Sequence, residues 1–103
     1  MDYQVVWSPE AIGDVESIAA YIARDSRFYA AAVVQTILDT ARTLERFPLR
    51  GRVVPEIDQE AIRERFVYSY RLIYRIQDDK VTIAAVIHGK RMLNPITDRM
   101  TRC

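Results

Sequence analysis

The stretch that decides the fold is Tyr68 to Arg91, which reads YSYRLIYRIQDDKVTIAAVIHGKR. Residues 69–76 mix aromatic, β-branched and long polar side chains, a composition typical of a strand on a partly buried pleated surface. Residues 81–87 are almost wholly apolar, which is typical of a central strand buried on both faces. The polar segment 77–80 between them contains two aspartates, which favour turns. We therefore predict a β-hairpin, followed directly by the basic strand end His88-Gly89-Lys90-Arg91.

Upstream of the hairpin, the apolar residues recur every three or four positions, as in helices. A weakly alternating segment at 2–7 first predicts a short strand. Ser8-Pro9-Glu10 then supplies an N-cap, a proline at the first helical position and an acid in the first turn, so a helix is expected at 9–24. A second amphipathic helix is expected at 27–47, where Pro48 would end it. The short joint between the two helices predicts an antiparallel helical hairpin.

The segment between the helices and the hairpin is expected to be loop up to a strand at 62–67. Residues 48–52 form a loop with two arginines beside a glycine, and residues 56–60 form an acidic loop. Alternation along the strand places Ile62, Glu64 and Phe66 on one face and Arg63, Arg65 and Val67 on the other. The expected fold is α+β, in the order β-α-α-β-β-β, with the helical hairpin packed on one face of a small, mainly antiparallel sheet.

Length and composition limit the kind of protein. A chain of 103 residues that is 50% hydrophobic and 28% charged predicts a single globular domain, here residues 1–93, with an irregular tail at 94–103. A net charge of +1 gives no general argument for nucleic-acid binding. One histidine and one cysteine provide no metal-ligand set, so no metal, cofactor or small-molecule ligand is expected. No long apolar run or signal peptide is evident, so a cytoplasmic protein without a membrane partner is expected.

The order of these pieces resembles the ParE/RelE superfamily of bacterial type II toxin–antitoxin toxins, on its ParE-like branch. The resemblance covers about residues 2–93 and rests on Ser-Pro-Glu-Ala at 8–11, Phe-Pro at 47–48, Gly-Arg at 51–52, Tyr-Arg-Leu-Ile-Tyr at 70–74 and His-Gly-Lys-Arg at 88–91. It implies a toxin bound by a cognate antitoxin in a hetero-oligomer, for example two copies of each. It also implies one of two activities, because RelE-like members cut mRNA on the ribosome whereas ParE-like members poison DNA gyrase.

If the activity is ribonucleolytic, the resemblance makes Arg71 and Arg91 the catalytic residues, since they match two arginines that RelE-like enzymes use to hold the phosphate. Cleavage by 2′-hydroxyl attack needs cations around the phosphate and an acid or base, for which His88 is a further candidate. The alternative for Arg71 is a structural ion pair with Glu64 or Asp79. The alternative for His88 is a hydrogen bond to the backbone at the strand end.

The remaining residues of the RelE-like set are absent. RelE-like ribonucleases have two lysines on the strand before the Tyr-Arg motif, where this chain has Ile62 and Glu64. They also have a tyrosine six residues after the arginine of the Gly-Lys-Arg motif, where this chain has Thr97. Arg63 and Arg65 are one position out of register and would face the other side of the sheet. These departures favour binding to DNA gyrase over cleavage of RNA.

Two contact surfaces are expected on this interpretation. The target-binding residues are expected to be Arg65, Arg71, His88, Lys90 and Arg91. Antitoxin binding, by a helix in a groove or an added strand, is expected to involve Ile12, Val15, Tyr68, Tyr70 and Tyr74, although tyrosines at this spacing also suit a core. The chain is thus interpreted as a gyrase-inhibiting toxin, with a ribosome-dependent mRNA endoribonuclease or a non-toxic partner-binding module as alternatives.

Overall fold

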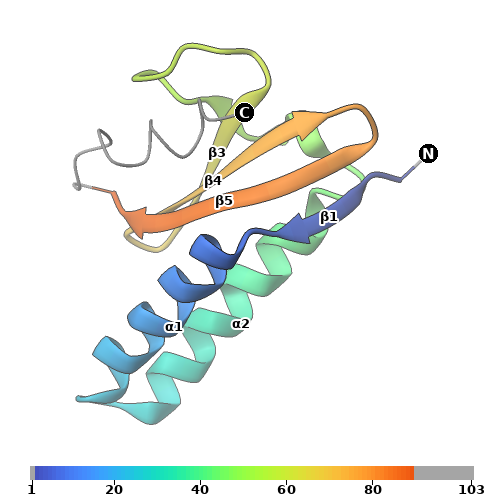
Figure 1. Ribbon diagram of the computed structural model, residues 1–103. Coiled ribbons are helices and arrows are strands. Elements are labelled where there is room, and N and C mark those ends of the chain that lie inside the picture. Colours follow the sequence, from blue (N-terminus) through green and yellow to red (C-terminus); the bar gives the residue numbers. More distant parts are fainter. Residues whose placement is uncertain (1, 90–103) are drawn as a thin grey trace.

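The helices form one layer and lie against one face of a five-stranded sheet (Figure 1). The computed structural model describes residues 2–89. The helices are α1 (Pro9–Ala23) and α2 (Arg27–Thr43), and a short 3-10 helix, η1 (Pro48–Arg50), follows them. The strands are β1 (Gln4–Trp7), β2 (Arg52–Val53), β3 (Ile62–Val67), β4 (Tyr70–Gln77) and β5 (Lys80–His88). The predicted α+β architecture and order of elements are confirmed, with β2 as an addition.

The two helices begin where the sequence predicts. The Ser8 side chain accepts a hydrogen bond from the Ala11 N–H at 3.1 Å, and the Ser26 side chain accepts one from the Tyr29 N–H at 3.0 Å. Each N-cap of this kind contributes about 1 kcal/mol of stability.

The predicted end of the second helix is wrong by four residues. The α-helix ends at Thr43, and the Leu44 N–H bonds the Ala41 carbonyl at 3.0 Å, three residues back. This tighter turn directs the chain toward the sheet, where Leu44 and Pro48 are buried.

The sheet has the order β1-β5-β4-β3-β2. β1 is parallel to β5, and the other neighbours are antiparallel. The predicted hairpin is present as β4 and β5, and its turn residue Asp78 has a φ of 56°, a left-handed conformation that aspartate tolerates. β2 was not predicted because two residues are too few to show a periodic pattern.

Hydrophobic residues cover both faces of β5, as its apolar sequence predicts. Val81, Ile83 and Val86 face the helices and belong to the main hydrophobic core, which lies between the helices and the sheet. Ala85 and Ile87 face the other side of the sheet and form a second hydrophobic cluster with Val54 and Ile62. A bulge allows this division. The register passes from the pair Ile73 and Ala85 to the pair Tyr74 and Ile83, skipping one residue of β5 and reversing its alternation there.

Two features often linked to function were sought in the described part of the chain. Residues 2–89 contain no group of three or more histidine, cysteine, aspartate or glutamate side chains placed to hold a metal ion. None of the described helices is long and apolar enough to cross a membrane.

Candidate functional site

Four charged side chains form an ion cluster on the face of the sheet opposite the helices. Arg71 donates from Nε to Glu64 at 2.6 Å and from its two terminal nitrogens to the two oxygens of Glu56, at 2.9 Å each. Arg52 donates from Nε to the other oxygen of Glu64 at 2.6 Å. The Glu64 side chain is 0% exposed and that of Arg71 is 5% exposed. Two arginines and two glutamates therefore neutralise one another in a cluster whose central pair, Glu64 and Arg71, is buried and whose outer members, Arg52 and Glu56, are exposed to solvent.

The sheet register brings this ion cluster together. Arg52 of β2 lies opposite Glu64 of β3, and Arg71 of β4 lies opposite Phe66, two positions further along β3 on the same face. Glu56 comes from the connection between β2 and β3, a segment that also contributes Val54 and Ile57 to the second hydrophobic cluster. The bidentate pair between Arg71 and Glu56 thus anchors this connection over the sheet.

Mutual hydrogen bonding changes the proton affinities within the ion cluster. The bonds from Arg71 hold the pKa of the Glu56 carboxyl below its ordinary range, and the bonds to Glu56, with Glu64 next, raise the pKa of Arg71. Arg71 is thus a permanent cation whose Nε and both terminal nitrogens already donate to carboxylates. The predicted alternative for Arg71, an ion pair with Glu64, is confirmed.

Acid should weaken the anchor between Glu56 and Arg71. Because the pKa of Glu56 is lower in the folded protein, its contribution to stability is full above the unfolded pKa and is lost as the pH falls through the folded value. We expect the free energy of unfolding to decline below about pH 4, with part of the decline removed in Glu56→Gln. The effect should be modest because the Glu56 side chain is 46% exposed and screened by water.

Urea unfolding at pH 7 and at pH 3 measures this effect. The matched control is Glu16→Gln on the exposed surface of α1, which should leave the pH dependence as in the wild type. Identical pH dependence in Glu56→Gln and the wild type would contradict the role of the anchor.

The predicted tyrosine surface is only partly present. Tyr74 is 0% exposed, and its hydroxyl donates to the Pro48 carbonyl at 2.6 Å and accepts from the Gly51 N–H at 3.1 Å. Tyr74 therefore belongs to the core, and its prediction as an antitoxin contact is wrong because no side-chain surface is available. Tyr68 lies in the turn after β3 with a φ of 55°, and its ring packs edge-on against Tyr29 at 6.2 Å. Tyr70 is partly buried.

Three more of the predicted contact residues, Ile12, Val15 and His88, are described by the structure. Ile12 and Val15 line an apolar hollow of about 280 Å³ with Trp7, Glu16 and Leu38. His88 is exposed at the end of β5, and its ring lies edge-on to Tyr70 with centroids 5.8 Å apart. Lys90 and Arg91 lie outside the described residues, so the structure does not place the predicted pair of Arg71 and Arg91.

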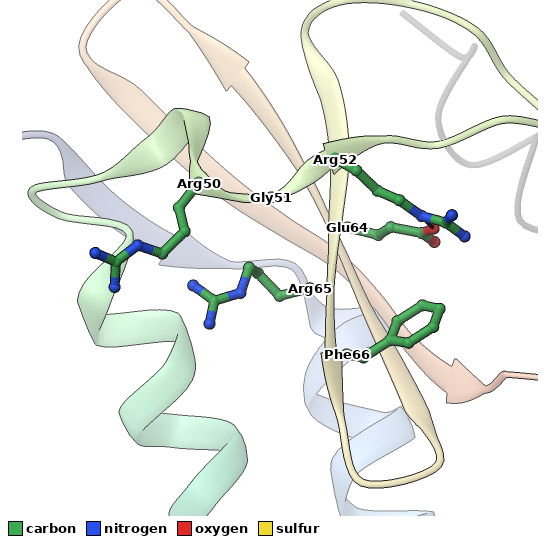
Figure 2. A pocket seen from close by; sticks show the side chains of 6 residues that line it. All are labelled: Arg50, Gly51, Arg52, Glu64, Arg65 and Phe66. Atoms are coloured by element: carbon green, nitrogen blue, oxygen red, sulfur yellow. Dashed lines mark hydrogen bonds and ion pairs between the residues drawn. The ribbon is translucent and has the colours of Figure 1, made fainter.

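A second cavity, of about 280 Å³, lies at the edge of the sheet beside β3. It is lined by Arg50, Gly51, Arg52, Glu64, Arg65 and Phe66. Figure 2 shows Arg50 and Arg65 pointing to one side of β3, and Arg52, Glu64 and Phe66 pointing to the other. The alternation predicted for residues 62–67 is thus confirmed, and Arg65 lies apart from the ion cluster.

Comparison with known proteins identifies the family. Residues 5–93 match the sequence model described as the ParE toxin of the type II toxin–antitoxin system parDE. Toxin RelE2 of Caulobacter vibrioides is 29% identical over 89 residues, which span 86% of this chain and 98% of that protein.

Solved structures agree with this assignment. The toxin–antitoxin complex RelBE2 of Mycobacterium tuberculosis contains a chain with 28% identity and a TM-score of 0.60, covering 85% of this chain and 99% of that one. The chromosomal ParDE system of P. aeruginosa gives a TM-score of 0.71 at 16% identity, with coverages of 85% and 97%, and so supports the fold. This chain is therefore a member of the ParE toxin family of type II toxin–antitoxin systems.

Proposed function

We propose that this toxin acts by binding DNA gyrase and stabilising its cleaved DNA complex, and that it does not cut RNA. The observation that carries the proposal is the ion cluster around Arg71. A catalytic arginine must have donors free for the phosphate, but the Nε and both terminal nitrogens of Arg71 already bond Glu64 and Glu56.

Glu64 strengthens the argument. RelE-like ribonucleases, which this chain resembles, have a lysine at the matching position, and its positive charge would attract the phosphate. Here a carboxylate with 0% exposed side chain lies between Arg52 and Arg71. A phosphate brought to this face would have to displace both glutamates from Arg71 and leave their carboxylates without that partner.

A protein target needs no such site. Binding energy at protein interfaces is concentrated in a few anchors, which often include arginine and aromatic residues. The proposed target contacts are Arg65, His88, Lys90 and Arg91, and Arg71 is removed from this set because its side chain is only 5% exposed. The proposed antitoxin contacts are the apolar hollow at Ile12 and Val15, together with Tyr68 and Tyr70. The M. tuberculosis relative was solved as a toxin–antitoxin complex, which supports an antitoxin partner here.

Two assays with purified toxin test the proposal. In one, gyrase, ATP and relaxed plasmid are incubated with the toxin, and we expect loss of supercoiling and accumulation of cleaved DNA. In the other, translating ribosomes are incubated with the toxin, and primer extension should show no new mRNA ends. Codon-specific cuts with no effect on gyrase would overturn the proposal and favour the ribosome-dependent ribonuclease.

Variants of the basic strand end refine the gyrase assay. Arg91→Ala, or truncation after Gly89, should raise the toxin concentration for half-inhibition by about tenfold or more, as expected for an interface anchor. Arg24→Ala is the matched control because Arg24 is exposed at the far end of α1, and it should inhibit like the wild type. If Arg91→Ala, the truncated protein and the Arg24→Ala control all inhibited gyrase equally, the strand end would be excluded from the target interface.

A further inference from the structure

One edge of the sheet is only partly covered. β2 pairs with β3 at Arg63 and Glu64, so within the described chain no strand lies beside residues 65–67 on that side. The Ile62 carbonyl accepts from the Val54 N–H at 3.1 Å on this side of β3. Since backbone groups alternate in direction along an antiparallel strand, the N–H and C=O of Phe66 also point toward the open edge. An open strand edge can accept an added strand.

Next to this open edge lie two arginines that have no acidic partner among residues 2–89. In the described part of the chain, Nη1 of Arg65 is buried and has no hydrogen-bond partner. Arg50 lies with its guanidinium 4.7 Å above the Phe47 ring. Among residues 2–89, neither Arg50 nor Arg65 makes an ion pair, whereas Arg52 and Arg63 each do. Both arginines line the cavity and have positive charge that no described carboxylate neutralises, so the cavity is suited to an anionic group from another molecule.

We propose that the antitoxin adds an extended segment along the open edge at residues 65–67 and places an Asp or Glu carboxylate between Arg65 and Arg50. Directly opposed residues of two strands point to the same face. The antitoxin residue opposite Arg65 is therefore acidic, and its neighbour opposite Phe66 is apolar. That neighbour packs on Phe66, a residue that is 58% exposed and whose ring has the Arg52 guanidinium 5.3 Å from its centroid.

The surroundings favour a peptide over a nucleic acid as the occupant. A strand satisfies the outward N–H and C=O of Phe66 together, which a phosphate backbone does not do. Glu64 neutralises Arg52 within the ion cluster, so the charge left to attract an anion is that of Arg50 and Arg65. The exposed Phe66 beside them suits an apolar side chain and not a second phosphate. This inference rests on the proposed function: because Arg65 is a proposed gyrase contact, an antitoxin bound here neutralises the toxin by covering part of its target surface.

The test uses the complex of the toxin with the protein encoded by the reading frame beside its gene. Hydrogen–deuterium exchange of the wild-type complex should show a slowed Phe66 amide. The amides of Arg65 and Val67 serve as internal controls because they face β4 in both states. In calorimetry, Arg65→Ala should weaken binding by about 30-fold or more, as expected for a lost charged pair, while Arg24→Ala stays within twofold of the wild type.

The outcomes separate this inference from the proposed function. Binding without protection of Phe66, and with Arg65→Ala within twofold of the wild type, overturns the inference alone. Absence of any binding by the neighbouring protein overturns the antitoxin partnership itself. Protection of Phe66 by gyrase or by DNA, and not by the neighbouring protein, overturns the choice of occupant. The exchange experiment uses the wild-type chain, so it decides the question even if Arg65→Ala folds poorly.

Discussion

Arg71→Ala is expected to destabilise the protein by about 3–5 kcal/mol, because it breaks a buried ion pair from one side. Removing the guanidinium leaves the Glu64 carboxylate, with 0% exposed side chain, bonded to Arg52 alone. It also releases Glu56, and with it the connection between β2 and β3. The free energy of unfolding, measured in urea by circular dichroism, gives the loss directly.

Two variants test whether buried charge causes the loss. Arg52→Ala removes the partner whose side chain is 62% exposed and should cost about 1 kcal/mol or less. The double variant Arg71→Met with Glu64→Leu removes both buried charges together and should recover most of the stability. An Arg71→Ala protein as stable as the wild type would show that the ion cluster contributes little to the fold.

The stability measured for Arg71→Ala decides how toxicity assays of Arg71 variants are interpreted. An Arg71 variant that no longer poisons cells can have lost its fold and not a catalytic group. A folded and stable Arg71→Ala protein without toxicity would instead support direct participation of Arg71 in the activity. Stability and toxicity therefore need to be measured on the same variants.

Gly51→Ala is the second change expected to have a large effect, with a loss of about 2–4 kcal/mol from overpacking and disturbed buried hydrogen bonds. A Cβ at this position would lie 2.6 Å from the Glu64 carbonyl oxygen and would collide with the Tyr74 hydroxyl. The glycine is required for space and not for an unusual backbone angle, since its φ is −72°. The Tyr74 hydroxyl, which accepts from the Gly51 N–H, would be displaced.

Gly13 supplies the matched control for this substitution. It lies inside α1, where an added Cβ would meet nothing within 4 Å, so Gly13→Ala should stabilise the protein by about 0.5–1 kcal/mol. Thermal unfolding of the two variants should therefore shift in opposite directions. Placing Gly51→Ala in a Tyr74→Phe background should cost less than it does alone, because the collision with the hydroxyl is gone. A Gly51→Ala protein within 0.5 kcal/mol of the wild type would contradict the close approach.

The sequence by itself determined the local elements and their faces. Ser8 caps the first helix as predicted, and Ser26 caps the second in the same way, because a cap depends on residues only three positions away. The hairpin at residues 70–88 follows from alternation and turn residues within a short stretch. Alternation also separated Glu64 from Arg65 correctly, since a strand puts neighbouring side chains on opposite faces.

Only the tertiary structure decided what these side chains meet. Arg71 bonds Glu56 and Glu64, which lie 15 and 7 residues away, and the sequence left the choice between Glu64 and Asp79 open. Tyr74 is buried because its hydroxyl finds backbone partners in the loop at Pro48 and Gly51, a contact that spacing on one strand cannot reveal. The open strand edge beside Phe66 depends on how far β2 extends along β3. Local patterns fix which face a side chain points to, but burial and charge pairing arise between segments brought together only by folding.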